Sequence, residues 1–171
     1  MEIVNYVYRG NLQEQLNLTN LLASIRHPDV QLIRHQTKQP EQLIIKFTNS
    51  NTLIFFKSGA FRMMDKCDDI NIHLNIYEII NQFSTQIPEI ILQTMTVCYN
   101  YNRKIHLTAM ACENGMQYTA EFFPAIQNRI FPGIHINIFS TGKVTITGVK
   151  DKMILPTIKN YLDNIVLRYL L

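Results

Sequence analysis

One stretch of the sequence decides the fold, Ile134-His-Ile-Asn-Ile-Phe-Ser-Thr-Gly-Lys-Val-Thr-Ile-Thr-Gly-Val-Lys150. Apolar and polar residues alternate on both sides of its Ser-Thr-Gly turn. Because successive side chains of a strand point to opposite faces, this pattern predicts a two-stranded antiparallel hairpin with an isoleucine-rich face and a polar face. Phe139 breaks the pattern, since it lies on the polar face. A large aromatic there is either covered by another part of the protein or exposed for a partner.

The length, composition and net charge of the chain are those of an ordinary, mildly basic globular protein. The chain has 171 residues, of which 47% are hydrophobic, and a formal net charge of +3, which permits an anionic partner without identifying one. Its three cysteines lack the paired spacing of a disulfide framework or a zinc site, so we expect a reducing compartment. The first residues lack a basic region followed by an apolar core, and no apolar run is long enough to span a bilayer. We therefore expect a soluble intracellular protein that contacts no membrane.

The first half of the chain reads as an α+β unit. A strand over 3–9 ends at a Gly10-Asn11 turn signal and is followed by a short helix over 20–26, with Thr19 as a possible N-cap. Four strands are predicted next, over 30–35, 42–47, 52–56 and 60–64. A longer helix then places a buried apolar stripe at Ile72, Ile76, Ile79, Ile80 and Phe83.

After Pro88 the same order of elements begins again. We predict a strand over 90–99, a helix over 107–113, strands over 116–120, 126–131, 134–139 and 143–147, and a final helix that starts near Met153 with Pro156 in its first turn. The turn glycines Gly59 and Gly142 correspond across an offset of 83 residues. The chain is thus interpreted as two repeats, 1–87 and 88–171, that form one structural unit. With all helices on one side, the other face of the strands is left uncovered.

With this order of elements, the sequence resembles the TATA-binding protein family over essentially its whole length. The stretch Tyr118-Thr-Ala-Glu-Phe-Phe-Pro-Ala-Ile126 is similar to the family's Tyr-Glu-Pro-Glu-Leu-Phe-Pro-Gly-Leu loop, and 138–150 is similar to its Ile-Phe-Val-Ser-Gly-Lys-Val-Val-Leu-Thr-Gly-Ala-Lys hairpin. The first half matches more weakly, through 5–7, 16–18 and 53–59. The resemblance implies a saddle in which two pseudo-repeats form a ten-stranded antiparallel sheet with four helices on its convex face.

The resemblance also implies a function and its residues. In this family the concave sheet face lies on the DNA minor groove, and pairs of phenylalanines pry base steps apart and bend the duplex. By this likeness Phe123 and Phe139 form the wedge pair of the second half. In the first half Phe56 matches one wedge, but Pro40 stands where the other phenylalanine belongs, so this half should kink DNA less or use a different residue as its wedge.

Two further sets of DNA-contacting residues follow from the likeness. The groove floor, which would favour A·T pairs because guanine adds an amino group to the minor groove, consists of Asn5, Val7, Thr94, Thr96, Asn137, Thr145 and Thr147. Phosphate contacts are expected from Arg129, Lys143 and Lys150. In the first half Ala60 and Cys67 replace the corresponding lysines, and Arg62 takes a place on the groove face.

The implied partners are AT-rich promoter DNA, a B-type initiation factor and the RNA polymerase machinery, acting in a nucleus or at a viral or cytoplasmic site of transcription. Tyr118 and Glu121 are the candidate contacts for the factor, while Thr119 replaces a second acid. The alternative is a protein-interaction module of a transcription or replication complex whose DNA binding is weak or lost. Scattered histidines and the lack of catalytic or metal-binding motifs favour a protein without enzymatic activity, small-molecule substrate, metal or cofactor.

Overall fold

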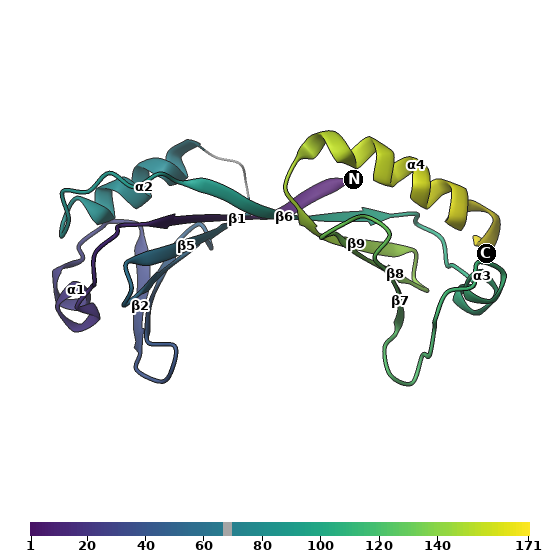
Figure 1. Ribbon diagram of the computed structural model, residues 1–171, viewed down its shortest axis with the longest axis horizontal. Coiled ribbons are helices and arrows are strands. Elements are labelled where there is room, and N and C mark those ends of the chain that lie inside the picture. The colour runs from purple at the N-terminus through teal and green to yellow at the C-terminus, as the bar shows by residue number, and fades with distance from the viewer. Residues whose placement is uncertain (67–69) are drawn as a thin grey trace. The chain divides into compact units, whose positions relative to one another are not determined.

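A computed structural model describes residues 1–66 and 70–171, with the side chains of residues 70–73 left out. The chain divides into two compact units (Figure 1). The N-terminal unit comprises Asn5–Gln93, and the C-terminal unit comprises Met1–Val4 together with Thr94–Leu171. Two features of the sequence, Cys67 and the Ile72 side chain, lie outside the described part. The repeat boundary between 87 and 88 stays a prediction.

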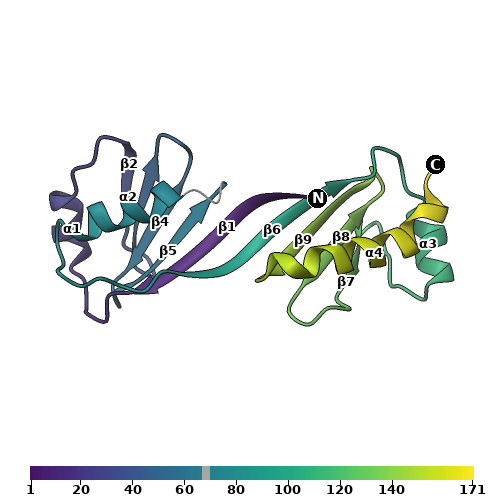
Figure 2. The same ribbon diagram turned by 90° about the horizontal axis from the view of Figure 1, so that it is seen from above.

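The N-terminal unit is an antiparallel sheet with two helices on one face. Its strands follow the order β2-β3-β4-β5-β1, where the bounds are β1 Glu2–Asn11, β2 Val30–Gln36, β3 Gln42–Phe47, β4 Thr52–Phe56 and β5 Ala60–Asp65. The helices are α1 (Leu18–Ser24) and α2 (Ile70–Ile80), and Figure 2 shows α2 above the strands. The predicted apolar stripe of α2 is confirmed at Ile76, Ile79 and Ile80, whose side chains are fully buried.

The C-terminal unit repeats this arrangement. Its strands follow the order β6-β9-β8-β7, with β6 at Ile91–Asn100, β7 at Ala125–Asn128, β8 at His135–Phe139 and β9 at Lys143–Val149. One face is covered by α3 (Leu107–Glu113) and α4 (Leu155–Val166), and α4 is flanked by 3-10 turns at Lys152–Ile154 and Leu167–Tyr169. The apolar face of the hairpin is buried as the alternation predicts: Ile136, Ile138, Val144 and Ile146 are each at most 1% exposed. The other face carries the polar residues and Phe139.

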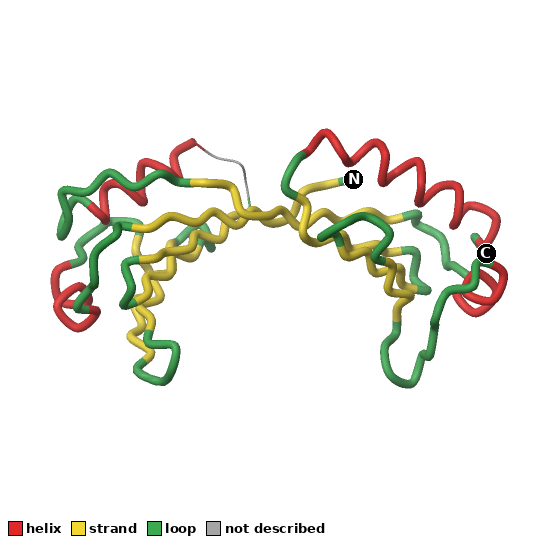
Figure 3. Tube along the Cα trace, in the orientation of Figure 1, coloured by secondary structure: helices red, strands yellow, loops and turns green. Residues whose placement is uncertain are grey.

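Three predictions about elements are wrong. Residues 116–120 form no strand, so the described residues hold nine strands instead of ten. Figure 3 draws the long connection between α3 and β7 as a loop. There the backbone bonds locally, since the amides of Phe122 and Phe123 both donate to the carbonyl of Thr119. Helix α1 begins earlier than predicted and is capped by Asn17, whose side chain accepts from the amide of Asn20. The Gly10-Asn11 turn signal is strand, because β1 continues through both residues.

Candidate nucleic-acid interface

The uncovered face of the C-terminal unit is lined by small polar side chains. Cross-strand pairing sets Cys98 beside Thr145, Thr145 beside Asn137, and Asn137 beside Gln127, so these four residues form one row across β6, β9, β8 and β7. Apart from the exposed Gln127 they are half-buried. Their contacts with each other are weak: the Asn137 amide lies 3.5 Å from the Thr145 hydroxyl. The row therefore offers donors and acceptors of low bulk to a partner.

Thr94, Thr96 and Thr147 extend this polar surface. All three are half-buried, and Thr147 pairs with His135 at the next position along β8. The hydroxyl of Thr94 is buried and has no hydrogen-bond partner among the described residues. A buried hydroxyl without a partner is uncommon, because losing hydration without a replacement bond costs free energy. Thr94 is thus a polar group that the chain itself leaves unsatisfied.

Phe123 and Phe139, predicted as a pair from the sequence, are brought together. Their ring centroids lie 6.4 Å apart with planes tilted by 52°, and 37% of the Phe123 surface is exposed. Phe139 is the last residue of β8 and pairs with Ala125 of β7, whose small side chain leaves room for the second ring. This is a loosely covered aromatic pair at the edge of a polar sheet face, and the outlier in the hairpin pattern is one member of it.

The turn after β8 fixes the position of Phe139. The amide of Gly142 donates to the Phe139 carbonyl over 3.0 Å, and Gly142 has a positive φ of 90°. A Cβ at this position would lie 2.2 Å from the backbone oxygen of Arg103. Only glycine therefore fits the close approach that ends the strand beside the aromatic pair.

The three predicted phosphate-contacting cations of this unit are exposed and uncompensated. Lys143 begins β9, Lys150 follows its last residue, and Arg129 follows the last residue of β7. None of them has an ion pair with a carboxylate in the part of the chain that the structure describes. Free ammonium and guanidinium groups beside a neutral polar face are suited to an anionic backbone.

The N-terminal unit presents a different surface. Half-buried Asn5, Val7 and Phe56 and exposed Arg62 lie on its uncovered face. The Arg62 guanidinium carbon lies 5.8 Å from the centroid of the Phe56 ring and so partly covers this aromatic. Pro40 is exposed in the loop between β2 and β3, and that loop contains no aromatic residue. The described residues of this loop thus place no second ring beside Phe56.

Sequence reasoning missed three cations on this face. The register places five residues in one row across β1, β5, β4, β3 and β2. In this order they are Arg9, Arg62, Ile54, Ile44 and Arg34, so the row carries three arginines. In the adjacent row exposed Lys46 of β3 pairs with Leu32 and Thr52. The alternation within each strand could have shown which face of the sheet these side chains lie on. It could not have shown that the cations are neighbours, because this depends on the pairing register of separate strands.

The predicted partner residues Tyr118 and Glu121 lie in the loop between α3 and β7. Tyr118 is half-buried and Glu121 is exposed. Tyr118 lines a cavity of about 460 Å³ together with Phe123 and Arg129. Phe122, which the sequence reading did not single out, is 89% exposed in the same loop. This exposed ring adds apolar surface to the loop.

An internally repeated α+β fold with a paired aromatic on an otherwise polar, uncovered sheet face defines the class of TATA-binding-protein-like folds. A sequence model described as transcription factor TFIID, or TATA-binding protein, matches residues 89–166. The TATA-box-binding protein of Thermoplasma volcanium is 26% identical over 161 residues, which cover 88% of this chain and 85% of that protein. The corresponding protein of Picrophilus torridus is 24% identical over the same shares. A solved structure of Methanococcus jannaschii TBP superposes with a TM-score of 0.76 at 24% identity, covering 96% of this chain and 97% of that one.

The chain is thus similar to TATA-binding proteins over most of its length, and the expected fold is confirmed. At the level of the family, this relationship supports a role in transcription initiation, with DNA and the transcription machinery as the classes of partner. Within residues 1–66 and 70–171, no helix is long and apolar enough to cross a membrane.

Proposed function

We propose that the protein is a transcription initiation factor that binds AT-rich duplex DNA in the minor groove and bends it. The observation that carries this proposal is the pair of Phe123, 37% exposed, and half-buried Phe139, whose ring centroids lie 6.4 Å apart. Apolar rings at the end of a polar sheet face are suited to enter a base step, where unstacking costs a few kcal/mol that protein contacts on the bent duplex offset. The C-terminal unit is the principal DNA-binding half.

The polar row supports selection of A·T pairs. Thr145, Asn137 and Thr147 are small, and their hydroxyl and amide groups can donate to the N3 and O2 acceptors of the minor groove. A guanine would add an amino group at the centre of the groove, where these close-lying side chains leave little room. The free Thr94 hydroxyl supplies one further donor. Lys143, Lys150 and Arg129 then hold the flanking phosphates.

Other roles in this proposal concern partners. The loop that contains Tyr118 and Glu121 would bind a B-type initiation factor, and exposed Phe122 would add apolar contact area to the same surface. The proposed role is binding without catalysis, and it requires neither a cofactor nor a small-molecule substrate. We place the protein inside the cell, at sites of transcription.

A bending assay tests the proposal. A short AT-rich duplex labelled at both ends with a fluorescent donor and acceptor should show a shorter end-to-end distance when protein is added at low salt. Phe139→Ala should reduce the bend while the melting temperature of the protein changes little, because the ring is only half-buried. Met153→Ala, which truncates an 81% exposed apolar residue beside α4, is the matched control. The proposal fails if the wild-type protein neither binds nor bends the duplex.

The N-terminal unit favours a second candidate function, a protein-interaction module. Its face lacks a wedge pair and exposes apolar groups between cations, with Ile54 and Met64 both half-buried. This alternative predicts that a partner protein is lost after Ile54→Ala and Met64→Ala but retained after Lys143→Gln and Lys150→Gln. The reverse pattern, with duplex binding dependent on the two lysines, favours the DNA-binding proposal.

A further inference from the structure

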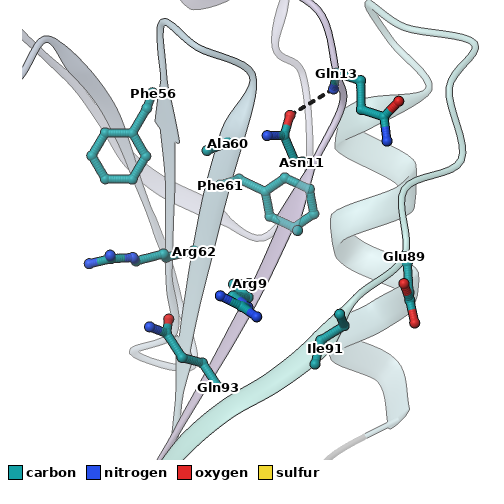
Figure 4. Close-up of a pocket in the computed structure, with 11 residues that line it drawn as sticks. Arg9, Asn11, Gln13, Phe56, Ala60, Phe61, Arg62, Glu89, Ile91 and Gln93 are labelled. Atoms are coloured by element: carbon teal, nitrogen blue, oxygen red, sulfur yellow. Dashed lines mark hydrogen bonds between the residues drawn. The ribbon is translucent and has the colours of Figure 1, made fainter.

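A cavity of about 550 Å³ lies within the N-terminal unit, at the ends of β1 and β5 (Figure 4). The small side chain of Ala60, which pairs with Asn11, leaves part of this space open, since the family resemblance places a lysine at this position. At Gly10 the Phe61 ring already fills the place of a side chain, because a Cβ there would lie 2.3 Å from it. The volume is in the range of cavities that hold small ligands or a segment of a larger one.

Two arginines line the cavity at directly paired positions. Arg9 of β1 faces Arg62 of β5 in the antiparallel register, and both side chains are exposed. Like charges at directly opposed positions repel each other and destabilise a sheet. Glu89 also borders the cavity, yet neither arginine has an ion pair with a carboxylate among the described residues. The pair lacks an anion that would offset this repulsion.

A third group that lines the cavity, the side-chain oxygen of Gln93, lacks a hydrogen-bond donor among the described residues. This oxygen is buried from water. Figure 4 shows the amide group of Gln93 below the guanidinium groups of Arg9 and Arg62, with which it lines the cavity. A buried acceptor without a donor costs free energy in the unliganded protein. Asn11, by contrast, is already engaged, since its side chain accepts from the amide of Gln13 over 2.7 Å.

We infer that this cavity binds a phosphate ester. The two guanidinium groups hold the phosphate oxygens in charge-assisted hydrogen bonds, for which the forked geometry of arginine is well suited. The Gln93 oxygen accepts from a hydroxyl or amino group on the organic part of the ester, and the edge of Phe56 borders the same space. A bare inorganic anion would leave Gln93 unsatisfied, so the site fits a nucleoside phosphate unit.

Two kinds of molecule can supply a phosphate ester to this cavity. One is a free nucleotide. The other is a phosphodiester of a nucleic acid bound to the same face, and this source rests on the proposed function. The site is distinct from the wedge pair of the C-terminal unit in either case, so variants of the cavity and of Phe139 can be scored independently.

The first arm of the test measures dATP binding to the full chain by titration calorimetry. Saturable binding is expected, and Arg9→Gln or Arg62→Gln should each weaken it about tenfold or more, since each removes a charge-assisted bond. Gln93→Leu should weaken it severalfold while leaving the melting temperature unchanged or higher, because it removes a buried unsatisfied acceptor. Arg26→Gln is the matched control, since the Arg26 guanidinium donates to the carbonyl of Ile25 and does not line the cavity.

The second arm measures how binding of an AT-rich duplex depends on salt. If the phosphodiester source applies, the double variant Arg9→Gln/Arg62→Gln should lower the slope of log K against log salt by about 0.9, the value for one lost phosphate contact. Either response, absent in Arg26→Gln, supports the inference and identifies the source. If dATP does not bind and the slope is unchanged, the inference is overturned. Bending that still depends on Phe139 would show in that case that the proposed function stands without it.

Discussion

Phe139 illustrates how one residue is placed by its neighbours. Its partner across the β7–β8 pair is Ala125, so the ring is not packed against a large side chain and the Phe123 ring lies beside it. The end of its strand depends on Gly142, whose left-handed backbone allows contact with the backbone of Arg103. The position of the Phe139 ring is therefore coupled to Gly142, three residues further along the chain.

This coupling gives a stability prediction for Gly142→Ala. A Cβ would meet a backbone oxygen at 2.2 Å in addition to the strain of φ +90°, and we expect a loss of more than about 2 kcal/mol in the free energy of unfolding. Gly115→Ala is the control. Gly115 also has a positive φ, of 63°, but open space around it, so only the backbone strain of about 1 kcal/mol applies. Equal losses in urea unfolding of the two variants would contradict the steric explanation.

At the scale of elements, β6 and α4 are tied by a polar cluster. The Tyr101 hydroxyl, just beyond β6, donates to the Asp163 carboxylate of α4 over 3.0 Å, and Lys159 also pairs with Asp163. Burial, followed by this hydrogen bond, raises the pKa of Tyr101 well above its usual range. The hydrogen bond to Asp163 likewise raises the pKa of Lys159. The cluster thus favours the protonated form of both groups in the folded chain.

The sign of the effect on stability follows directly. Because the folded pKa of Tyr101 is raised, its contribution is fully present below the unfolded pKa of about 10 and is lost as pH rises beyond it. Tyr101→Phe should lower the free energy of unfolding by about 1 kcal/mol at neutral pH. Above pH 10 the difference between wild type and variant should shrink, measured by urea unfolding at stepped pH. A difference that stays constant to the onset of alkaline unfolding would exclude this role for Tyr101.

The elements also show what the sequence alone could establish. The alternation over 134–147 predicted the hairpin and its buried face correctly, because period-two patterning is local information. The strand predicted over 116–120 failed because sheet pairing is decided elsewhere: the loop satisfies its amides at Thr119 instead. The Arg9–Arg62 pair and the cavity beside Gln93 could not be foreseen, since both depend on register between strands far apart in the chain.

For the molecule as a whole, the two repeats have diverged unequally. The family's sequence model matches only residues 89–166, although the relatives align over 88% of the chain. The face of the C-terminal unit carries the aromatic pair among small polar side chains, with Arg129, Lys143 and Lys150 at the strand ends. The face of the N-terminal unit carries Arg9, Arg34, Lys46 and Arg62 and a single aromatic partly covered by Arg62. We therefore expect the C-terminal unit to kink DNA and the N-terminal unit to contact it mainly through charge.

Because the N-terminal unit has one aromatic where the C-terminal unit has a pair, we predict that a second ring can be restored to it. Pro40 stands 83 residues before Phe123, the same offset that separates Phe56 from Phe139. Pro40→Phe should therefore supply the missing ring of the N-terminal unit and bend an AT-rich duplex more than wild type does, at the cost of unstacking one further step. Gln39→Phe adds the same ring at the neighbouring exposed position of the loop and serves as the control. The donor–acceptor distance on the labelled duplex should shorten with Pro40→Phe and not with Gln39→Phe, whereas equal bends for wild type and both variants would mean that the N-terminal unit does not lie on DNA as the C-terminal unit does.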